Sequence, residues 1–168
     1  MRVTLEAALV AQGAALRWRV PGAAPSDGYA WTSGTYADTT WQTGSTGIGY
    51  DTTPDYQSLL ATSVQGAMYN LQPSIFLRVP FTAPNVNRIG RLTLRMKYED
   101  GYWAWINGTA IAHHGAPDPV SWNSTATDTR DEDAAITFRD DDVSAFIPAL
   151  VTGANMLAIQ GLNESSAS

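Results

Sequence analysis

The chain has 168 residues, of which 44% are hydrophobic and 15% are charged. This balance predicts one folded domain with one core and excludes a disordered tail, which would be charge-rich and poor in apolar residues. The formal net charge is -6 and no basic stripe is present, which argues against nucleic acid as a partner and against binding to anionic lipid. No apolar run reaches the ~20 residues of a membrane span, and the absence of cysteine excludes disulfides and zinc–thiolate sites.

The N-terminal half predicts short strands separated by turns. Residues 16–20 read as a first strand, because apolar and polar residues alternate there. Residues 31–50 predict a Gly- and Thr-rich loop whose aromatic side chains plug the edge of a core. Residues 62–68 predict a short helix, and residues 75–82 a strand. Pro80 places that strand at a sheet edge, since proline donates no ladder hydrogen bond.

The C-terminal half gives the clearest pattern. Residues 91–98 alternate strictly, so one face is buried and the other is polar. A turn at residues 99–101 then predicts a return strand at 102–106. Asn107-Gly108 is a strong signal for a tight hairpin into a strand at 109–112. Further along, we expect a loop at 113–133, a strand at 134–138, a helical turn at 143–150 and a buried strand at 155–162.

Strands at this spacing, with no βαβ unit, predict an all-β fold. The expected architecture is a single antiparallel β-sandwich of the jelly-roll type with one or two short helical turns. Its core would span about residues 14–163, with a Ser-rich tail at 164–168.

Three segments carry a family resemblance. Residues 92–109, LTLRMKYEDGYWAWINGT, are similar to the strand–turn–strand–hairpin of galactose-binding-like jelly rolls, including the sugar-binding domains of family 2 glycosidases. Residues 150–159, LVTGANMLAI, resemble the signature that opens a late strand in the same domains. Residues 41–50, WQTGSTGIGY, resemble a loop of jelly-roll accessory modules in large secreted planctomycete-type proteins. Related domains run on into one more strand, so an early end would leave an unpaired sheet edge open to self-assembly.

The resemblance implies a non-catalytic carbohydrate-binding or adhesion module of a larger secreted bacterial protein, located outside the cell or on its surface. Glu6 stands where a signal peptide would be apolar, so any export signal is expected upstream. One alternative is a structural domain that spaces or assembles its neighbours without binding sugar. Another is a small hydrolase, which would need two carboxylates across a cleft. Fold alone does not decide among these.

Trp103 and Trp105 are the leading ligand-binding candidates. Alternation puts both on the face opposite the core, and on the predicted hairpin they share that face with Arg95. Large aromatics beside a cation can stack on sugar rings, while Arg95 would bind hydroxyls, a uronate or a sulfate. The alternative is a cation–π pair, or a flanking loop at 31–50 that covers and buries both indoles.

Other candidates lie in turns and loops. Trp122 is a loop aromatic suited to a sugar or, alternatively, to anchoring the loop. Asp100 and His114 are polar candidates. His113 and His114 would rarely share one metal ion, because adjacent strand residues point to opposite faces.

The resemblance also implies a structural calcium ion. Asp128, Asp131 and Asp133 have roughly alternating spacing and are the candidate ligands, since calcium is a hard cation that takes six to eight oxygen ligands. A solvated acidic loop is the alternative, and no motif fixes a ligand set.

Overall fold

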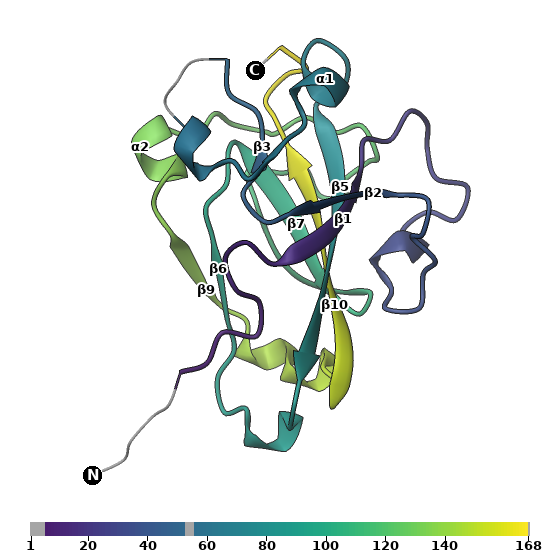
Figure 1. Cartoon of the computed structure of the whole chain (residues 1–168), viewed down its shortest axis with the longest axis vertical. Coiled ribbons are helices and arrows are strands. Elements are labelled where there is room, and N and C mark those ends of the chain that lie inside the picture. The colour runs from purple at the N-terminus through teal and green to yellow at the C-terminus, as the bar shows by residue number, and fades with distance from the viewer. Residues whose placement is uncertain (1–5, 53–55, 168) are drawn as a thin grey trace.

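The computed structural model describes residues 6–52 and 56–167. Short helices and loops surround two layers of strands (Figure 1). The strands of the described residues are β1 Ala15–Arg19, β2 Gln42–Ser45, β3 Ile48–Gly49, β4 Thr62–Ser63, β5 Ser74–Ala83, β6 Thr93–Met96, β7 Gly101–Ile106, β8 Thr109–His114, β9 Arg139–Asp142 and β10 Gly153–Leu162. The α-helices are α1 Gln65–Met68 and α2 Glu132–Ala135, and the 3-10 helices are η1 Ala30–Thr32, η2 Gln57–Leu59, η3 Val86–Arg88 and η4 Ser144–Ala149.

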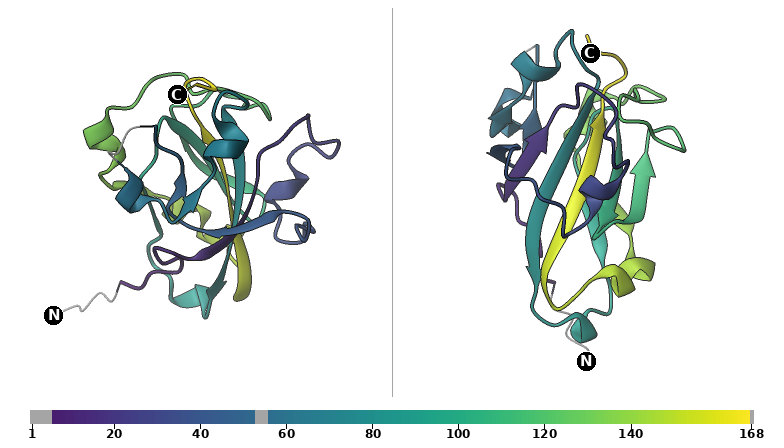
Figure 2. Two further views of the ribbon diagram at one scale, coloured as in Figure 1. Left: turned by 45° about the horizontal axis from the view of Figure 1, so that its top comes forward. Right: turned by 90° about the vertical axis from the view of Figure 1, so that its right-hand side faces the viewer.

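A six-stranded antiparallel sheet organises the molecule, in the order β2-β1-β5-β10-β7-β8. Its centre is the pair β5 and β10, which match residue for residue over their full length. These long strands run side by side in Figure 2. The edges of the sheet are β2 and β8.

The inner face of this sheet carries the main core. Leu77, Val79, Ile159 and Ala104 alternate along neighbouring strands and are 8% exposed or less. The second layer packs against them and is made of two separate pairs, β6 with β9 and β3 with β4. The all-β sandwich expected from the sequence is therefore confirmed, with a discontinuous second sheet.

The hairpin between β7 and β8 is also confirmed. Asn107 and Gly108 both have positive φ, 50° and 90°, the geometry of the tight two-residue turn. The Asn107 side chain also fixes its neighbours: its amide donates to the Ala149 carbonyl and to Asn155 Oδ1, and its oxygen accepts from the Met156 amide. One residue thus links the hairpin to η4 and to β10.

The predicted pairing of residues 91–98 with 102–106 is wrong. The strand β6 pairs with β9, while β7 lies between β10 and β8. The chain at 99–101 crosses from one layer to the other, so that Leu94 and Tyr102 both face the core between them. Strict alternation predicts which face is buried but not which strand lies alongside.

Two other local predictions need correction. The segment 134–138 is not a strand, because α2 covers its start and β9 begins at Arg139. Pro80 does not place β5 at the edge of the sheet, since β5 lies between β1 and β10. The β1 pairing ends at Arg78, so Pro80 lies on a stretch of β5 that has only β10 beside it.

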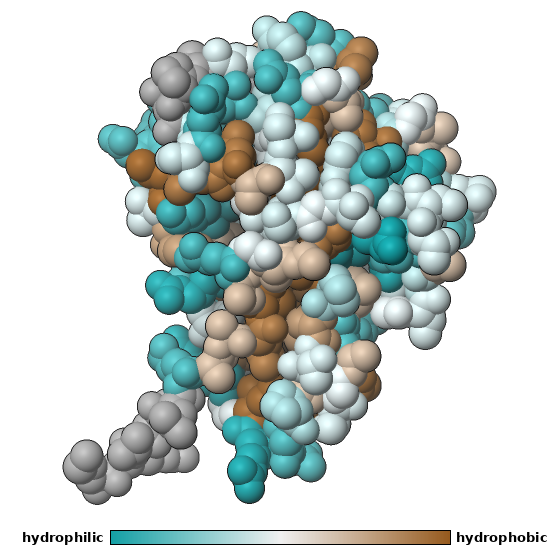
Figure 3. Space-filling model, in the orientation of Figure 1, coloured by the Kyte–Doolittle hydropathy of each residue, from teal (hydrophilic) through white to brown (hydrophobic). Residues whose placement is uncertain are grey.

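None of the helices in the described residues is long and apolar enough to cross a membrane. On the face shown in Figure 3, a strip of hydrophobic residues lies among hydrophilic ones in the middle of the molecule.

Candidate functional site

The outer face of the six-stranded sheet holds a second cluster of apolar side chains. Trp103 and Trp105 lie on this face, as the alternation predicted, and Phe76 and Ala158 lie beside them on β5 and β10. The sheet is therefore covered on both faces. Loops cover this face, and the right-hand view of Figure 2 shows the segment around η1 in front of β5 and β10.

Four aromatic rings form a continuous row across this face. The ring of Tyr29 contacts Trp105 with centroids 6.0 Å apart. Trp105 stacks on Trp103 at 5.6 Å, and Trp103 stacks on His113 at 4.3 Å with an interplanar angle of 8°. Trp105 is only 5% exposed, whereas Tyr29 is 47% exposed and His113 is also exposed. The middle of the row is thus buried, and the rings at its two ends are exposed to solvent.

The loop at 116–122 crosses this aromatic row. The Trp103 indole Nε1 donates to the Pro117 carbonyl at 3.0 Å, and the Tyr29 hydroxyl donates to the Val120 carbonyl. From below, the buried Gln160 amide donates to the Ser121 carbonyl at 2.7 Å. Three anchors therefore hold this loop against the sheet, and Trp122 packs half-buried into the same cluster.

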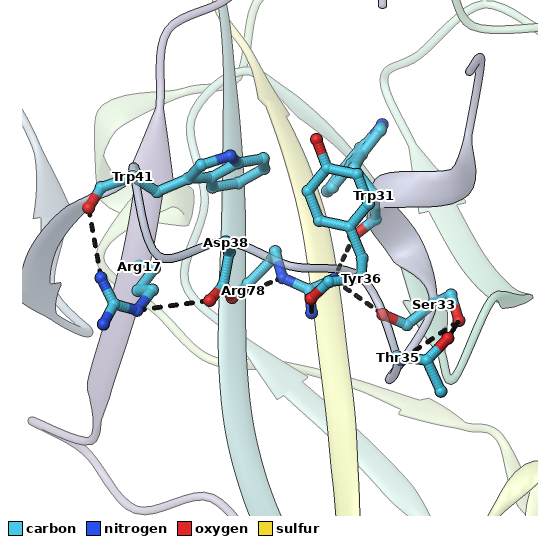
Figure 4. A network of polar contacts seen from close by, with 8 residues as sticks. All are labelled: Arg17, Trp31, Ser33, Thr35, Tyr36, Asp38, Trp41 and Arg78. Carbon is cyan, nitrogen blue, oxygen red and sulfur yellow. Dashed lines mark hydrogen bonds and ion pairs between the residues drawn. The ribbon is translucent and has the colours of Figure 1, made fainter.

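A buried arginine holds the second covering loop. Arg78, on β5, is 1% exposed and donates to the carbonyl oxygens of Trp31, Ser33 and Tyr36 and, at 2.7 Å, to Asp38 Oδ2 (Figure 4). These acceptors wrap around one guanidinium group, whose fixed fork of donors suits several oxygens at once. Trp31, placed in this way, packs its ring on Phe76 at 4.3 Å and on Trp105 at 5.5 Å. The alternative in which a flanking loop buries the sheet aromatics thus holds for Trp105.

Arg95 lies away from the aromatic row. It is exposed on β6 in the other layer, where its Nε donates to Asp140 Oδ1 at 2.7 Å. Its guanidinium carbon lies 5.3 Å from the centroid of the Phe138 ring. The predicted grouping of Arg95 with Trp103 and Trp105 is wrong, because it rested on the hairpin that β6 and β7 do not form.

Asp100 has a structural environment. It is 5% exposed, its Oδ1 accepts from the Arg130 amide at 3.1 Å, and its Oδ2 accepts from the Glu164 amide at 2.7 Å. It thereby holds two distant chain segments together. Its neighbour Glu99 is exposed, yet packing around the carboxyl group and the nearby carboxylates of Asp100 and Glu132 raise the pKa of Glu99 to about 7.

His114 belongs to a polar group between the two layers. Its Nε2 lies 3.0 Å from Asp141 Oδ1 and 3.1 Å from Arg139 Nε. Tyr102, 1% exposed, donates its hydroxyl to Asp141 Oδ2 at 2.8 Å. Burial alone would raise the pKa of Asp141, but the hydrogen bonds from Tyr102 and His114 outweigh it and the pKa is lowered. Burial and the hydrogen bond to Asp141 raise the pKa of Tyr102. His113 and His114 point to opposite faces, as predicted.

The acidic loop does not assemble a metal site. Asp128, Asp131 and Asp133 are all exposed, and Asp128 Oδ1 accepts from the adjacent Thr129 amide at 3.0 Å. Across residues 6–52 and 56–167, no three His, Asp or Glu side chains are grouped so that they could hold a metal ion. The three candidates therefore do not fit calcium, which takes six to eight oxygens. Calcium binding by the domain stays a prediction without a ligand set.

The structure adds to this face two residues that are not among the ligand-binding residues predicted from the sequence. Tyr29 has an exposed ring at one end of the row, and Asp118 is an exposed carboxylate on the crossing loop. Both lie in turn-rich segments without periodicity. A weak signal was present, since Tyr29 follows a Ser-Asp-Gly turn and Asp118 stands between two prolines.

Several solved structures contain a part with a fold similar to that of this chain. A β-glucuronidase from Ruminococcus gnavus in complex with D-glucuronic acid matches with a TM-score of 0.55 and 13% identity, over 90% of this chain and 21% of that chain. A β-glucuronidase from an uncultured Clostridium sp. matches with a TM-score of 0.54 and 11% identity, over 97% and 24%. A calcium-binding mutant of Bacteroides uniformis β-glucuronidase 2 matches at 0.50 and 14%, over 91% and 14%.

The chain thus shares the fold of one part of these enzymes and spans between 14% and 24% of their length. The expected likeness to a jelly-roll domain of family 2 glycosidases is confirmed. At 11 to 14% identity, the likeness shows the fold alone. No protein-family model matches the chain, and no curated protein matches its sequence.

Proposed function

We propose that this chain is a non-catalytic carbohydrate-binding module of a larger secreted protein. Its binding surface is the crossing loop at 116–123 together with the two open ends of the aromatic row, Tyr29 and His113. We name this surface the loop face. The buried Trp105 supports it from underneath, and Trp103 and Trp122 form its half-buried floor.

The observation that carries the proposal is the rigid mounting of exposed rings. Tyr29 is 47% exposed, but its ring rests on Trp105 and its hydroxyl is held by the Val120 carbonyl. His113 is exposed and held flat on Trp103. Sugar-binding surfaces use aromatic rings against the C–H edges of the sugar, and a ring that is already fixed loses little conformational entropy on binding.

Polar groups stand beside these rings. Asp118, Ser121 and Asn123 are exposed on the crossing loop and offer donors and acceptors for sugar hydroxyls. The loop itself is held by side-chain bonds to its carbonyl oxygens. A few placed polar groups beside a mainly apolar surface are typical of small-ligand sites.

Two observations support a non-catalytic role: the length of the chain and the number of carboxylates on the crossing loop. The chain spans at most 24% of the solved β-glucuronidases named above. Residues 116–123 contain one carboxylate, that of Asp118, whereas most glycoside hydrolases use two carboxyl groups facing each other across the bond.

A glycan array with the purified domain tests the proposal. Tyr29→Ala and His113→Ala remove the exposed rings, and Tyr69→Ala is the matched control, because Tyr69 is also exposed (37%) but packs on Tyr50 instead. We expect specific binding by the wild type and Tyr69→Ala that either ring variant loses. If the folded wild type bound no glycan on the array, either with calcium or with chelator, carbohydrate binding would be overturned. If only Tyr69→Ala lost glycan binding, the binding site would lie elsewhere on the molecule.

A further inference from the structure

The charges around the loop face differ from those of the rest of the molecule. Residues 22–41 and 115–129, the two segments that cover the outer face, contain no lysine and no arginine. They carry four acids, Asp27, Asp38, Asp118 and Asp128. Asp27 and Asp118 are exposed.

The cations on the outer face of the sheet are already paired or distant. Arg78 and Arg17 share the carboxylate of Asp38, at 2.7 and 3.3 Å. Arg19 lies on β1, which β5 and β10 separate from β7. Three strand spacings of ~4.8 Å separate the backbone of β1 from that of β7 by about 14 Å.

Most of the remaining cations lie on the second layer and its loops. Arg91, Arg95 and Arg139 form ion pairs there with Asp142, Asp140 and Asp141 respectively, and Lys97 lies 5.0 Å from the Phe138 ring centroid. Arg95 and Arg139 belong to the pair β6 and β9, and Arg91 and Lys97 flank β6, so none of the four lies on the six-stranded sheet. These arginine and lysine side chains therefore lie away from the exposed aromatic row, whose only basic member in the described residues is the imidazole of His113.

The Tyr29 end of the aromatic row shows the local effect of the negative charge on the covering loops. Tyr29 bonds to Val120, two residues beyond Asp118. Burial raises the pKa of Tyr29, and the negative charge of Asp118 raises it further. An anion at this surface would meet a carboxylate and find no guanidinium or ammonium group from either covering loop.

From this charge pattern, and resting on the proposed function, we infer that the loop face binds uncharged glycans and rejects uronates and sulfated sugars. Recognition of carboxylate and sulfate groups is normally built on arginine or lysine, which both covering loops lack. A carboxylate such as that of Asp118 instead accepts hydrogen bonds from sugar hydroxyls. The ligand class thus differs from the D-glucuronic acid in the Ruminococcus gnavus complex, which that enzyme binds in its own structure.

Titration calorimetry with matched pairs of oligosaccharides tests this inference. The pairs share linkage and anomeric configuration and differ only at C6: α-1,4-linked galacto-oligosaccharides against oligogalacturonates, and cello-oligosaccharides against their C6-oxidised glucuronate forms. We expect heat from at least one neutral member and at least tenfold weaker binding of its acidic counterpart. Neutral binding should change less than twofold between low and high salt, because no ion pair forms.

Asp118 variants complete the test. Asp118→Asn should weaken neutral binding about tenfold, since a charge-assisted hydrogen bond becomes a neutral one. Asp118→Arg should lose neutral binding and gain measurable uronate binding. Tighter binding of the acidic member by the wild type would overturn the inference and leave carbohydrate binding intact. Absence of heat with both members of every pair would instead count against the proposed function itself.

Discussion

Arg78 Nε donates to Asp38 Oδ2 at 2.7 Å on the outer face of the sheet, and the arginine side chain is 1% exposed. This buried pair sits at the centre of the bonds that hold residues 31–38 over the aromatic row. Arg17 reaches the other oxygen of the same carboxylate at 3.3 Å but is 35% exposed. One aspartate therefore has a buried and a half-buried cation, which gives a matched pair of mutations.

Arg78→Lys should destabilise the domain by about 1–3 kcal/mol, because a lysine cannot satisfy Asp38 and three carbonyl groups together and leaves buried acceptors without a partner. Arg17→Lys should cost less than about 1 kcal/mol, because the Arg17 side chain is partly open to solvent, lysine keeps its charge, and solvent-accessible ion pairs contribute little. Urea unfolding followed by tryptophan fluorescence measures both. Equal costs for the two variants would contradict the role given to Arg78.

Gly101→Ala should be strongly destabilising. A Cβ at this position would lie 2.1 Å from the Gly115 carbonyl oxygen, and the backbone would have to move. We expect a loss of about 1–3 kcal/mol or more, the cost of overpacking. Gly90→Ala is the control, because a Cβ at residue 90 would meet nothing within 4 Å and the φ of Gly90 is not positive. A Gly101→Ala domain as stable as the control would show that β7 and the start of the crossing loop are not packed this closely.

The carboxyl of Glu99 should make stability depend on pH near neutrality. Its pKa is raised from 4.5 to about 7 in the folded chain, so between these values the folded state binds more protons than the unfolded state. Stability from this group is therefore lost as the pH rises through this window. Glu99→Gln should unfold at higher urea than the wild type at about pH 8, and the difference should shrink by about pH 5.

Glu6→Gln is the matched control for Glu99→Gln, because it removes the same formal charge from an exposed residue. Parallel stability curves for the wild type and Glu99→Gln across this pH range would show that the pKa of Glu99 is not raised.

Tyr102→Phe should weaken the bond between the two layers. Its hydroxyl donates to Asp141 at 2.8 Å, and hydrogen bonds to charged groups contribute about 1.5–3 kcal/mol. This bond lowers the pKa of Asp141, so its stabilisation is present above the unfolded pKa and is lost as the pH falls. The stability gap between the wild type and Tyr102→Phe should therefore narrow below about pH 4. Tyr69→Phe, at an exposed ring, should change little at any pH, and a constant gap for Tyr102→Phe would contradict this account.

The sequence predicts much of this fold because local patterns decide it. Strict alternation gives the buried faces of β7 and β10, and Asn107-Gly108 gives the hairpin, since only certain residues adopt positive φ easily. Alternation does not say which strands are neighbours, and for this reason it wrongly places β6 beside β7 and Arg95 beside Trp103. Non-local contacts decide these features.

The loop face can be predicted only in part. Trp103 and Trp122 stand out because tryptophan outside an expected core is conspicuous, but their partial burial depends on a loop that Gln160 holds from below. The burial of Trp105 depends on Trp31, which Arg78 holds in place from 27 residues before Trp105 in the sequence. Tyr29 and Asp118 come together through the bond from Tyr29 to Val120, 91 residues apart. No spacing rule in a sequence announces such a contact.

The most direct test of carbohydrate binding at the loop face is an NMR titration of the 15N-labelled domain with neutral oligosaccharides, which also detects weak binding. Each of the six tryptophans has its own indole N–H signal. We predict shifts of the Trp103 and Trp122 indole signals and of the backbone amides of the non-proline residues in 116–123, with the Trp18 indole and the strands β6 and β9 unchanged. A spectrum without shifts, or with shifts confined to β6 and β9, would contradict carbohydrate binding at the loop face.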